Sequence, residues 1–268
     1  MTEIIDLVDD RAAPGFVSEH GLSLWIRHGG ERILFDTGAG GALAPNARTL
    51  GVDLGSASRI VLSHSHNDHT GGLAAVPVKC PVHVGRGFGA PCYSRHADGS
   101  VHSLAVPEAS RRVLAASLSV VAPTFEEIAP GVFLSGAIVR GFGREGTSSF
   151  FRDAACTIPD SVSEEQTLLT DDGVLVTGCC HAGLVNTVRS FTSRPDAPRI
   201  RAIVGGLHLL HADGDELLRL ADFLGSLELE KLVLLHCTGD AAVALLESHL
   251  ACEVVRGRAG DRFSFGGK

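Results

Sequence analysis

The sequence predicts an α/β protein in which two mixed sheets pack face to face with helices outside, an αββα sandwich. Two observations favour this class: apolar strand-like runs alternate with helical stretches in both halves, and an antiparallel hairpin opens each half. A third observation concerns domains. No linker rich in proline, glycine or serine divides the 268 residues, so we expect residues 1–268 to form one domain.

The first half opens with a predicted hairpin. Leu22, Leu24 and Ile26 lie on one face of an alternating run, and a second run at 32–35 follows the turn at 28–31. Scattered polar residues without a period predict long loops at 78–112. The other elements expected here are a helix at 41–50, a strand at 59–62, a short helix at 73–76, and short strands near 118–121 and 132–134.

The second half has a more regular pattern. A hairpin is expected around the Asp-Asp-Gly turn at 171–173, between strands at 166–170 and 173–177. Strands and helices then alternate. The expected elements are a helix through 191, a strand at 200–204, a helix at 213–227, a strand at 231–235, a helix to about 250, and closing strands at 252–255 and 262–265.

Composition restricts the partners. A net charge of -8 and a pI near 5.9 disfavour binding to nucleic acid. The acidic N-terminus has no basic region followed by an apolar stretch, and no segment has the ~20 apolar residues of a membrane span. The seven cysteines include no C-x-x-C pair, which favours reduced thiols. We therefore expect a soluble, cytoplasmic protein that binds neither nucleic acid nor membrane.

The most informative segment is V-L-S-H-S-H-N-D-H-T-G-G, residues 61–72. His64 and His66 are two residues apart, so in extended geometry they point the same way. Asp68 and His69 lie past the turn and can face a second ion. Imidazole and carboxylate are the ligands shared by zinc, iron and manganese. The spacing behind an apolar strand therefore favours a metal site over a polar loop that happens to be rich in histidine.

Three later histidines each follow an apolar strand at its C-terminal end: His181, His208 and His236. Ligands gathered at strand ends are how open α/β sheets usually build a site. One such histidine alone is more often a capping or hydrogen-bonded core residue. Because a two-metal site needs more ligands than the loop at 64–69 supplies, all three are candidates.

The order of these motifs resembles the metallo-β-lactamase superfamily. The resemblance rests on D-T-G at 36–38, H-S-H-N-D-H at 64–69, G-C-C-H-A-G at 178–183 and a late strand that ends in histidine. The phrases E-H-G-L-S at 19–23, G-G-L-H-L at 205–209 and H-C-T-G at 236–239 narrow the resemblance to one branch of the superfamily. They are similar to the dihydropterin ribofuranosyl-aminobenzene-phosphate synthase-like branch.

The resemblance implies two metal positions. His64, His66 and His181 would bind the first ion, and Asp68, His69 and His236 the second. Many superfamily members have a bridging aspartate where this chain has Cys179. Either the Cys179 thiolate binds there, or the bridge is missing and the second site is weak. Zinc is expected first, with iron, manganese or magnesium as alternatives.

Other residues have predicted supporting roles. Asp36 would hydrogen-bond a ligand or the metal loop, although an aspartate that caps the turn is an equal alternative. Cys179, if it is not a ligand, would also lie just behind the metals. Arg140 and Arg144 would bind a substrate phosphate, although solvated surface arginines are commoner. The G-x-G-x-x-G pattern at 141–146 neither follows a clear strand nor opens a helix, which disfavours a dinucleotide site.

The expected function is that of a metal-dependent hydrolase or a related transferase. A metal-activated hydroxide would attack a small anionic substrate that carries a phosphate or a pterin. Asp68 would orient the nucleophile, and His208 would protonate the leaving group or bind the oxyanion. Two alternatives remain: an iron-dependent oxidoreductase of the same fold, and a non-catalytic metal-binding protein.

Overall fold

The computed structural model describes residues 1–143 and 145–266. A first mixed sheet has the strand order β17-β1-β2-β3-β4-β5-β8. The pairs from β17 to β3 are antiparallel, and those from β3 to β8 are parallel. Its strands are β1 (Thr2–Val8), β2 (Ser23–His28), β3 (Glu31–Phe35), β4 (Arg59–Val61), β5 (Val82–Val84), β8 (Ser119–Val121) and β17 (Arg262–Phe265).

The second mixed sheet has the order β16-β15-β14-β13-β12-β10-β9. The neighbours β13, β14, β15 and β16 are parallel, so their carboxyl ends share one edge. Its strands are β9 (Glu126–Ala129), β10 (Val132–Leu134), β12 (Leu168–Thr170), β13 (Val174–Thr177), β14 (Ala202–Gly205), β15 (Lys231–Leu234) and β16 (Glu253–Arg256).

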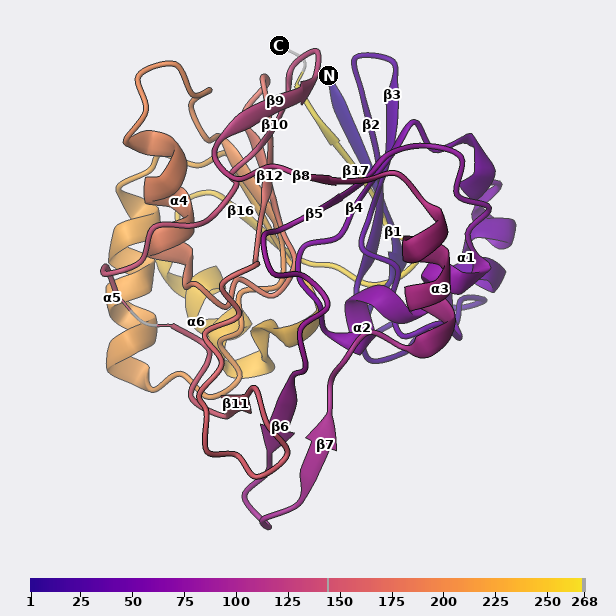
Figure 1. Ribbon diagram of the computed structural model, residues 1–268. Helices are drawn as coiled ribbons and strands as arrows, with labels where there is room; N and C mark the ends of the chain where they lie inside the picture. Colours follow the sequence, from indigo (N-terminus) through magenta and orange to yellow (C-terminus); the bar gives the residue numbers. More distant parts are fainter. Residues whose placement is uncertain (144, 267–268) are drawn as a thin grey trace.

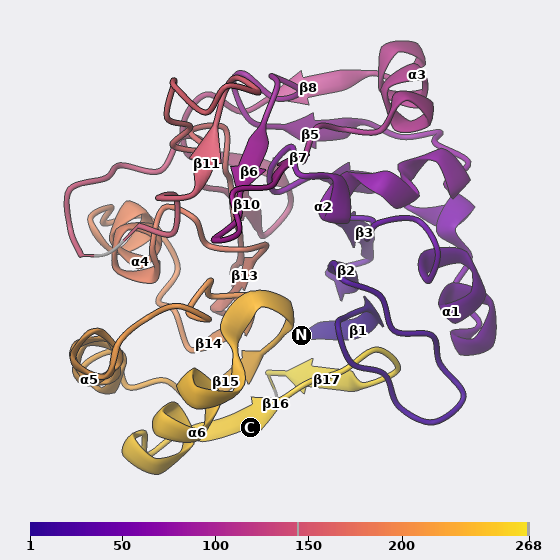
Figure 2. The same cartoon turned by 90° about the horizontal axis from the view of Figure 1, so that it is seen from below.

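Helices cover the outer faces of both sheets, and a small third sheet projects from one end (Figure 1). That sheet pairs β11 with β6 and β6 with β7. Seen from below, α1, α2 and α3 lie on the side of the first sheet, and α4, α5 and α6 lie on the side of the second (Figure 2). The α-helices are α1 (Leu43–Leu50), α2 (Asn67–Thr70), α3 (Glu108–Ala116), α4 (Leu184–Thr192), α5 (Gly214–Gly225) and α6 (Asp240–His249). The strands of the third sheet are β6 (Tyr93–Arg95), β7 (Val101–Ser103) and β11 (Phe150–Phe151). The 3₁₀ turns are η1 (Leu54–Ser56), η2 (Gly71–Ala75) and η3 (His236–Thr238).

The predicted αββα sandwich is confirmed, and its apolar residues divide into layers. Ile26 of β2 and Val204 of β14 belong to the core between the sheets. Trp25 points the other way, into a second core beneath α1, so β2 is buried on both faces. A third core packs α4, α5 and α6 on the second sheet. Burial of apolar surface in three layers is the main force that holds the sandwich together.

Several predicted elements were wrong or missing. The region 78–112 contains β5, β6, β7 and the start of α3 instead of long loops. Strands of three residues are too short to show a period, which explains the miss. The helix expected at 73–76 is the 3₁₀ turn η2, and β9 was not anticipated. Neither was β1, whose Glu3 and Asp6 interrupt an otherwise apolar run.

Within the described ranges, no helix is long and apolar enough to cross a membrane. No cysteine in the part of the chain that the structure describes forms a disulfide bond, as the composition predicts.

Candidate metal centre

The predicted ligands converge where the two sheets meet. β4 ends just before the loop with His64 and His66, and α2 carries Asp68 and His69. Figure 1 places α2 at the end of the sandwich from which β6 and β7 project. The loops after β13 and β15 bring His181 and His236 to the same place from the second sheet. The site therefore draws on both sheets.

A first group of potential ligand atoms comes from His64, Cys179 and His181, which lie within 4.8 Å of one another. The Nε2 atoms of the two histidines are 3.2 Å apart. His181 Nδ1 lies 3.1 Å from the Gly146 carbonyl, to which it can only donate, so its Nε2 carries the lone pair. His64 Nδ1 lies 2.8 Å from Ser63 Oγ. Both Nε2 atoms are therefore free to bind a cation.

A second group comes from His69, Cys179 and His236. His69 Nδ1 donates to Asp36 Oδ2 over 2.7 Å, and His236 Nδ1 donates to Asp10 Oδ1 over 2.7 Å. These carboxylates orient the rings so that Nε2 faces the group. Asp68 lies beside it. Its Oδ2 is 3.3 Å from His236 Nε2 and 3.5 Å from His69 Nε2.

His66 lies beside the first group. Its ring centroid is 4.5 Å from that of His64 and 4.9 Å from that of His181. Its Nε2 lies 3.3 Å from Cys92 Sγ, so Nδ1 is the nitrogen that remains for a ligand role. Cys92 is thus a neighbour of the site that the sequence did not single out.

Burial controls the charge of these histidines. It lowers the pKa of His64 and His181 well below the ordinary value, and that of His66 to about 4. All three rings are therefore neutral at neutral pH, as metal ligands must be. Burial also opposes charge on His236, but Cys237 and the carboxylates of Asp10 and Asp68 outweigh it and raise the pKa of His236. A cation that binds through Nε2 must displace that proton.

The donor set fits divalent metal ions. With the Nδ1 atoms held by their partners, the Nε2 atoms of the histidines in the two groups converge on the buried Cys179 thiol. The Asp68 carboxylate lies beside those of His69 and His236. At most one hydrogen can lie between the Nε2 atoms of His64 and His181. This combination of nitrogen, sulfur and oxygen donors matches the ligands that zinc and similar ions prefer.

The other predicted residues lie at different distances from the centre. Asp36 is fully buried and accepts hydrogen bonds from His69 and from the amide and hydroxyl of Ser63. The His208 ring centroid is 4.6 Å from that of His181. Arg140 pairs with Glu145 at 2.5 Å and donates to the Val162 carbonyl. Arg144 lies outside the described residues.

The structure adds Asp10 and Glu165, which the sequence did not reveal, and places His20 beside the site. Asp10 joins His236 to the exposed His20, whose Nε2 lies 3.5 Å from Asp68 Oδ2. The Glu165 carboxylate accepts hydrogen bonds from the backbone amides of His181 and Ala182. The E-H-G-L-S phrase includes His20, so the sequence held a signal for it. Asp10 and Glu165 lie in no motif.

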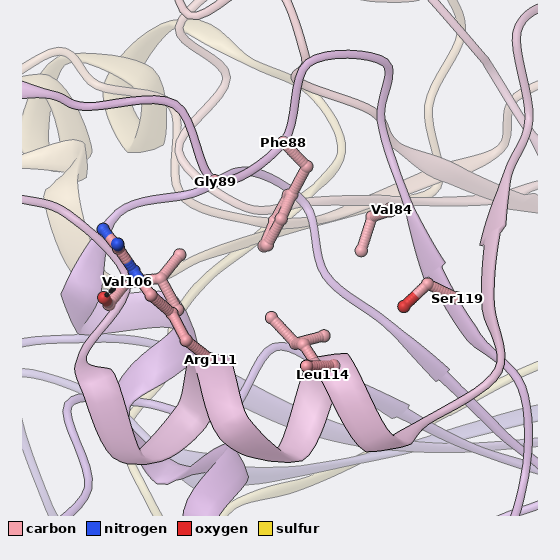
Figure 3. Close-up of a pocket in the computed structure, with 8 residues that line it drawn as sticks. Val84, Phe88, Gly89, Val106, Arg111, Leu114 and Ser119 are labelled. Atoms are coloured by element: carbon pink, nitrogen blue, oxygen red, sulfur yellow. Dashed lines mark hydrogen bonds between the residues drawn. The ribbon is translucent and has the colours of Figure 1, made fainter.

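A surface pocket of about 340 Å³ lies away from these groups, between α3 and the loop after β5. Figure 3 shows Phe88, Leu114 and Arg111 around it. Its link to the centre is indirect: the Gly89 amide donates to Ser65 Oγ, and Ser65 lies between His64 and His66. The pocket lining contains none of the predicted metal ligands.

Comparison with known proteins agrees with the fold and the motifs. Residues 19–132 match the sequence profile of the metallo-beta-lactamase superfamily. The structure of Tm1679, described as a metal-dependent hydrolase of the beta-lactamase superfamily, superposes with a TM-score of 0.87 and 29% identity over 100% of both chains. A diphosphatase from the PhnP family has a TM-score of 0.54 and 12% identity, over 99% of this chain and 98% of that one. The latter likeness shows the fold alone.

The fold and its motifs are similar to those of the metallo-beta-lactamase superfamily. The chain is also similar to a curated protein of Methanocaldococcus jannaschii, named 7,8-dihydropterin-6-methyl-4-(beta-D-ribofuranosyl)-aminobenzene-5'-phosphate synthase. The two are 26% identical over 98% of this chain and 96% of the relative. The branch resemblance noted in the sequence is therefore confirmed.

Proposed function

We propose that this chain is a metal-dependent hydrolase, or a related transferase, that acts on a small anionic substrate bearing a phosphate or a pterin. One observation carries the proposal: two groups of histidine nitrogens share the Cys179 sulfur at the meeting edge of the sheets, and the Asp68 carboxylate lies beside the second group. Such an arrangement suits two ions. Zinc fits the donors best, and iron or manganese remain compatible with them.

The six proposed ligands divide between the two ions. His64, His66 and His181 would hold the first ion, while Asp68, His69 and His236 would hold the second. When bound, a metal pair lowers the pKa of a water to about 7 and stabilises negative charge on the substrate and leaving group. Asp68 is placed to orient the nucleophile because its carboxylate lies beside His69 and His236.

The chain's own residues would also handle substrate and proton. His208 lies beside the first group, against His181 and Phe150. From there it can donate a proton to a leaving group or a hydrogen bond to an oxyanion. Arg140 and Arg144 are proposed to attract the anionic part of the substrate. Arg140 would first have to exchange its partner Glu145 for the substrate.

A synthase reaction is the second candidate, because the name of the M. jannaschii relative states one. In that case, bond formation to an aminobenzene ribose phosphate would release diphosphate from a dihydropterin methyl diphosphate. Hydrolysis would consume water instead. Measuring diphosphate release with and without the aminobenzene acceptor separates the two reactions, since only transfer depends on that acceptor.

The test combines metal analysis with an activity screen. Purified protein should contain up to two divalent ions per chain and turn over a member of a panel of phosphodiesters, phosphomonoesters, lactones and thioesters. His66→Ala should lose both metal and turnover while its circular dichroism stays unchanged. Undiminished turnover in His66→Ala would contradict the assignment.

A further inference from the structure

Cys179 occupies the position common to both ligand groups. Its sulfur lies within 4.8 Å of ligand atoms of His64 and His181, and also of His69 and His236. The distance from Cys179 Sγ to His69 Nε2 is 3.1 Å. We propose that the Cys179 thiolate is a ligand shared by both metal positions and that it selects zinc, cobalt or iron over magnesium and calcium. The inference rests on the proposed function, since it presupposes two ions at this centre.

The chain holds Cys179 at the seam between the sheets by close backbone approaches. A Cβ on the preceding Gly178 would lie 2.1 Å from Ser63 Oγ, so only glycine allows this loop to touch the loop that carries His64. A Cβ on Gly206 would likewise lie 2.6 Å from the Gly178 carbonyl oxygen. The loops after β4, β13 and β14 are therefore packed tightly around Cys179, a residue that is 3% exposed.

The neighbouring cysteines do not share this placement. Cys180 has φ 61°, its Sγ lies 3.4 Å from Thr187 Oγ1, and it joins the apolar core beneath α4. Cys237 Sγ lies 3.7 Å from the Cys179 carbonyl oxygen. Within the described residues, neither sulfur belongs to a group of potential metal ligands. The geometry thus assigns the ligand role to Cys179 and supplies Cys180 as a matched control.

The chemistry of sulfur determines which ions are selected. Thiolate is a soft donor that favours zinc, iron and cobalt, whereas magnesium and calcium require oxygen ligands. Binding breaks the S–H bond: a sulfur lone pair goes to the metal and the proton leaves to solvent.

The test uses the full chain loaded with cobalt(II), because thiolate-bound cobalt absorbs in the near ultraviolet. We expect a sulfur-to-cobalt band in the wild type and in Cys180→Ser, and its loss in Cys179→Ser. Cys179→Asp should restore binding of two ions without the band and should bind manganese or magnesium at least tenfold more tightly than the wild type does.

The outcomes separate this inference from the proposed function. Two bound ions with no thiolate band in the wild type, or a band that survives in Cys179→Ser, overturns the shared ligand while leaving a metal enzyme in place. Absence of metal binding in the wild type overturns both. If Cys179→Ser does not fold, X-ray absorption of the zinc-loaded wild type decides: sulfur among the zinc ligands supports the inference, and only nitrogen and oxygen ligands overturn it.

Discussion

The Nε2 atoms of His64 and His181 lie 3.2 Å apart although 117 residues separate them in the chain. His64 is placed by the loop after β4 of the first sheet, and His181 by the loop after β13 of the second. Their contact means that the first group of potential ligands forms only when both sheets are packed together. Residues that hold either loop should therefore affect metal binding and stability together.

Glu165 is one such residue. Its Oε1 and Oε2 accept hydrogen bonds from the amides of His181 and Ala182 over 2.6 and 2.7 Å, in a fully buried setting. Glu165→Gln would place an amide N–H₂ group against one of these donors. Because a buried unsatisfied donor costs about 1–3 kcal/mol, we expect the free energy of unfolding to fall by about that amount in urea denaturation.

A matched surface variant gives the comparison. Glu127 accepts one backbone hydrogen bond, from the Gly131 amide, at an exposed turn. Glu127→Gln keeps a carbonyl acceptor for this bond and should change stability by less than about 0.5 kcal/mol. Equal effects of the two substitutions would argue against a special role for Glu165 at the His181 loop.

Asp36 supports the second group of potential ligands through His69. Its carboxylate accepts hydrogen bonds from His69 Nδ1 and from both the amide and the hydroxyl of Ser63. In Asp36→Asn, one oxygen becomes a donor and meets another donor. Removal of a hydrogen-bond partner that orients a metal ligand lowers metal affinity by about 10–100-fold. Isothermal titration with zinc should therefore show a loss of affinity of that size for one of two ions.

The control for Asp36 tests its alternative role as a simple turn cap. Asp53 is an aspartate of that kind, whose side chain accepts from the Gly55 amide at the start of η1. Asp53→Asn should leave zinc affinity unchanged. A zinc titration of Asp36→Asn that matches wild type would mean that Asp36 acts only as a cap.

The sequence predicted what is local or periodic. His64 and His66 follow an apolar strand at a spacing that itself indicates metal chemistry, and His181 and His236 could be chosen because they end apolar runs. The fold class followed from alternation in both halves. These features are encoded within a few neighbouring residues, so they could be predicted without the structure.

Long-range partners could not be predicted in this way. Asp10 reaches His236 across 226 residues. His236 lies in a motif, but Asp10 does not, so nothing in the sequence links the two. Strands of three residues, such as β6 and β7, have no detectable period. The position of Cys179 between both ligand groups depends on how tightly three loops pack at Gly178 and Gly206, which the sequence alone does not specify.

His83 provides a test of pH dependence away from the metal centre. It lies in β5, is buried, and neither ring nitrogen has a hydrogen-bond partner among the described residues. Burial, aided by the positive charge of Arg59, lowers the pKa of His83 from the ordinary 6.5 to about 4. The unfolded chain therefore binds this proton more tightly, and the folded state loses stability as pH falls from about 6.5 toward 4.

Replacement of His83 by an apolar residue should remove this loss of stability at low pH. In His83→Leu, we expect the loss of unfolding free energy between pH 7 and pH 4.5 to be smaller than in wild type by about 1–3 kcal/mol. Denaturation with chelator present keeps metal binding out of the comparison. The exposed His249 of α6 is the control: His249→Leu should keep the wild-type slope, and an unchanged slope in His83→Leu would contradict the pKa assignment.

His208 tests the division between metal binding and proton transfer. Its ring lies against His181 and Phe150, with centroids 4.6 and 5.8 Å away, yet within the described residues it joins neither ligand group. His208 has φ 50°, a conformation that asparagine tolerates, so His208→Asn preserves the backbone. We expect this variant to retain wild-type zinc content while kcat falls by about 10²–10⁴-fold, the usual contribution of a positioned acid.

The exposed His211, three residues further along the same loop, serves as the control, and His211→Asn should retain wild-type kcat. Zinc content by elemental analysis and kcat on the substrate found in the screen are measured on the same samples. Loss of zinc in His208→Asn would make His208 a ligand instead of an acid. Wild-type kcat with full zinc content would limit His208 to packing against His181, because a group that moves a proton in the rate-limiting step cannot be removed without slowing it.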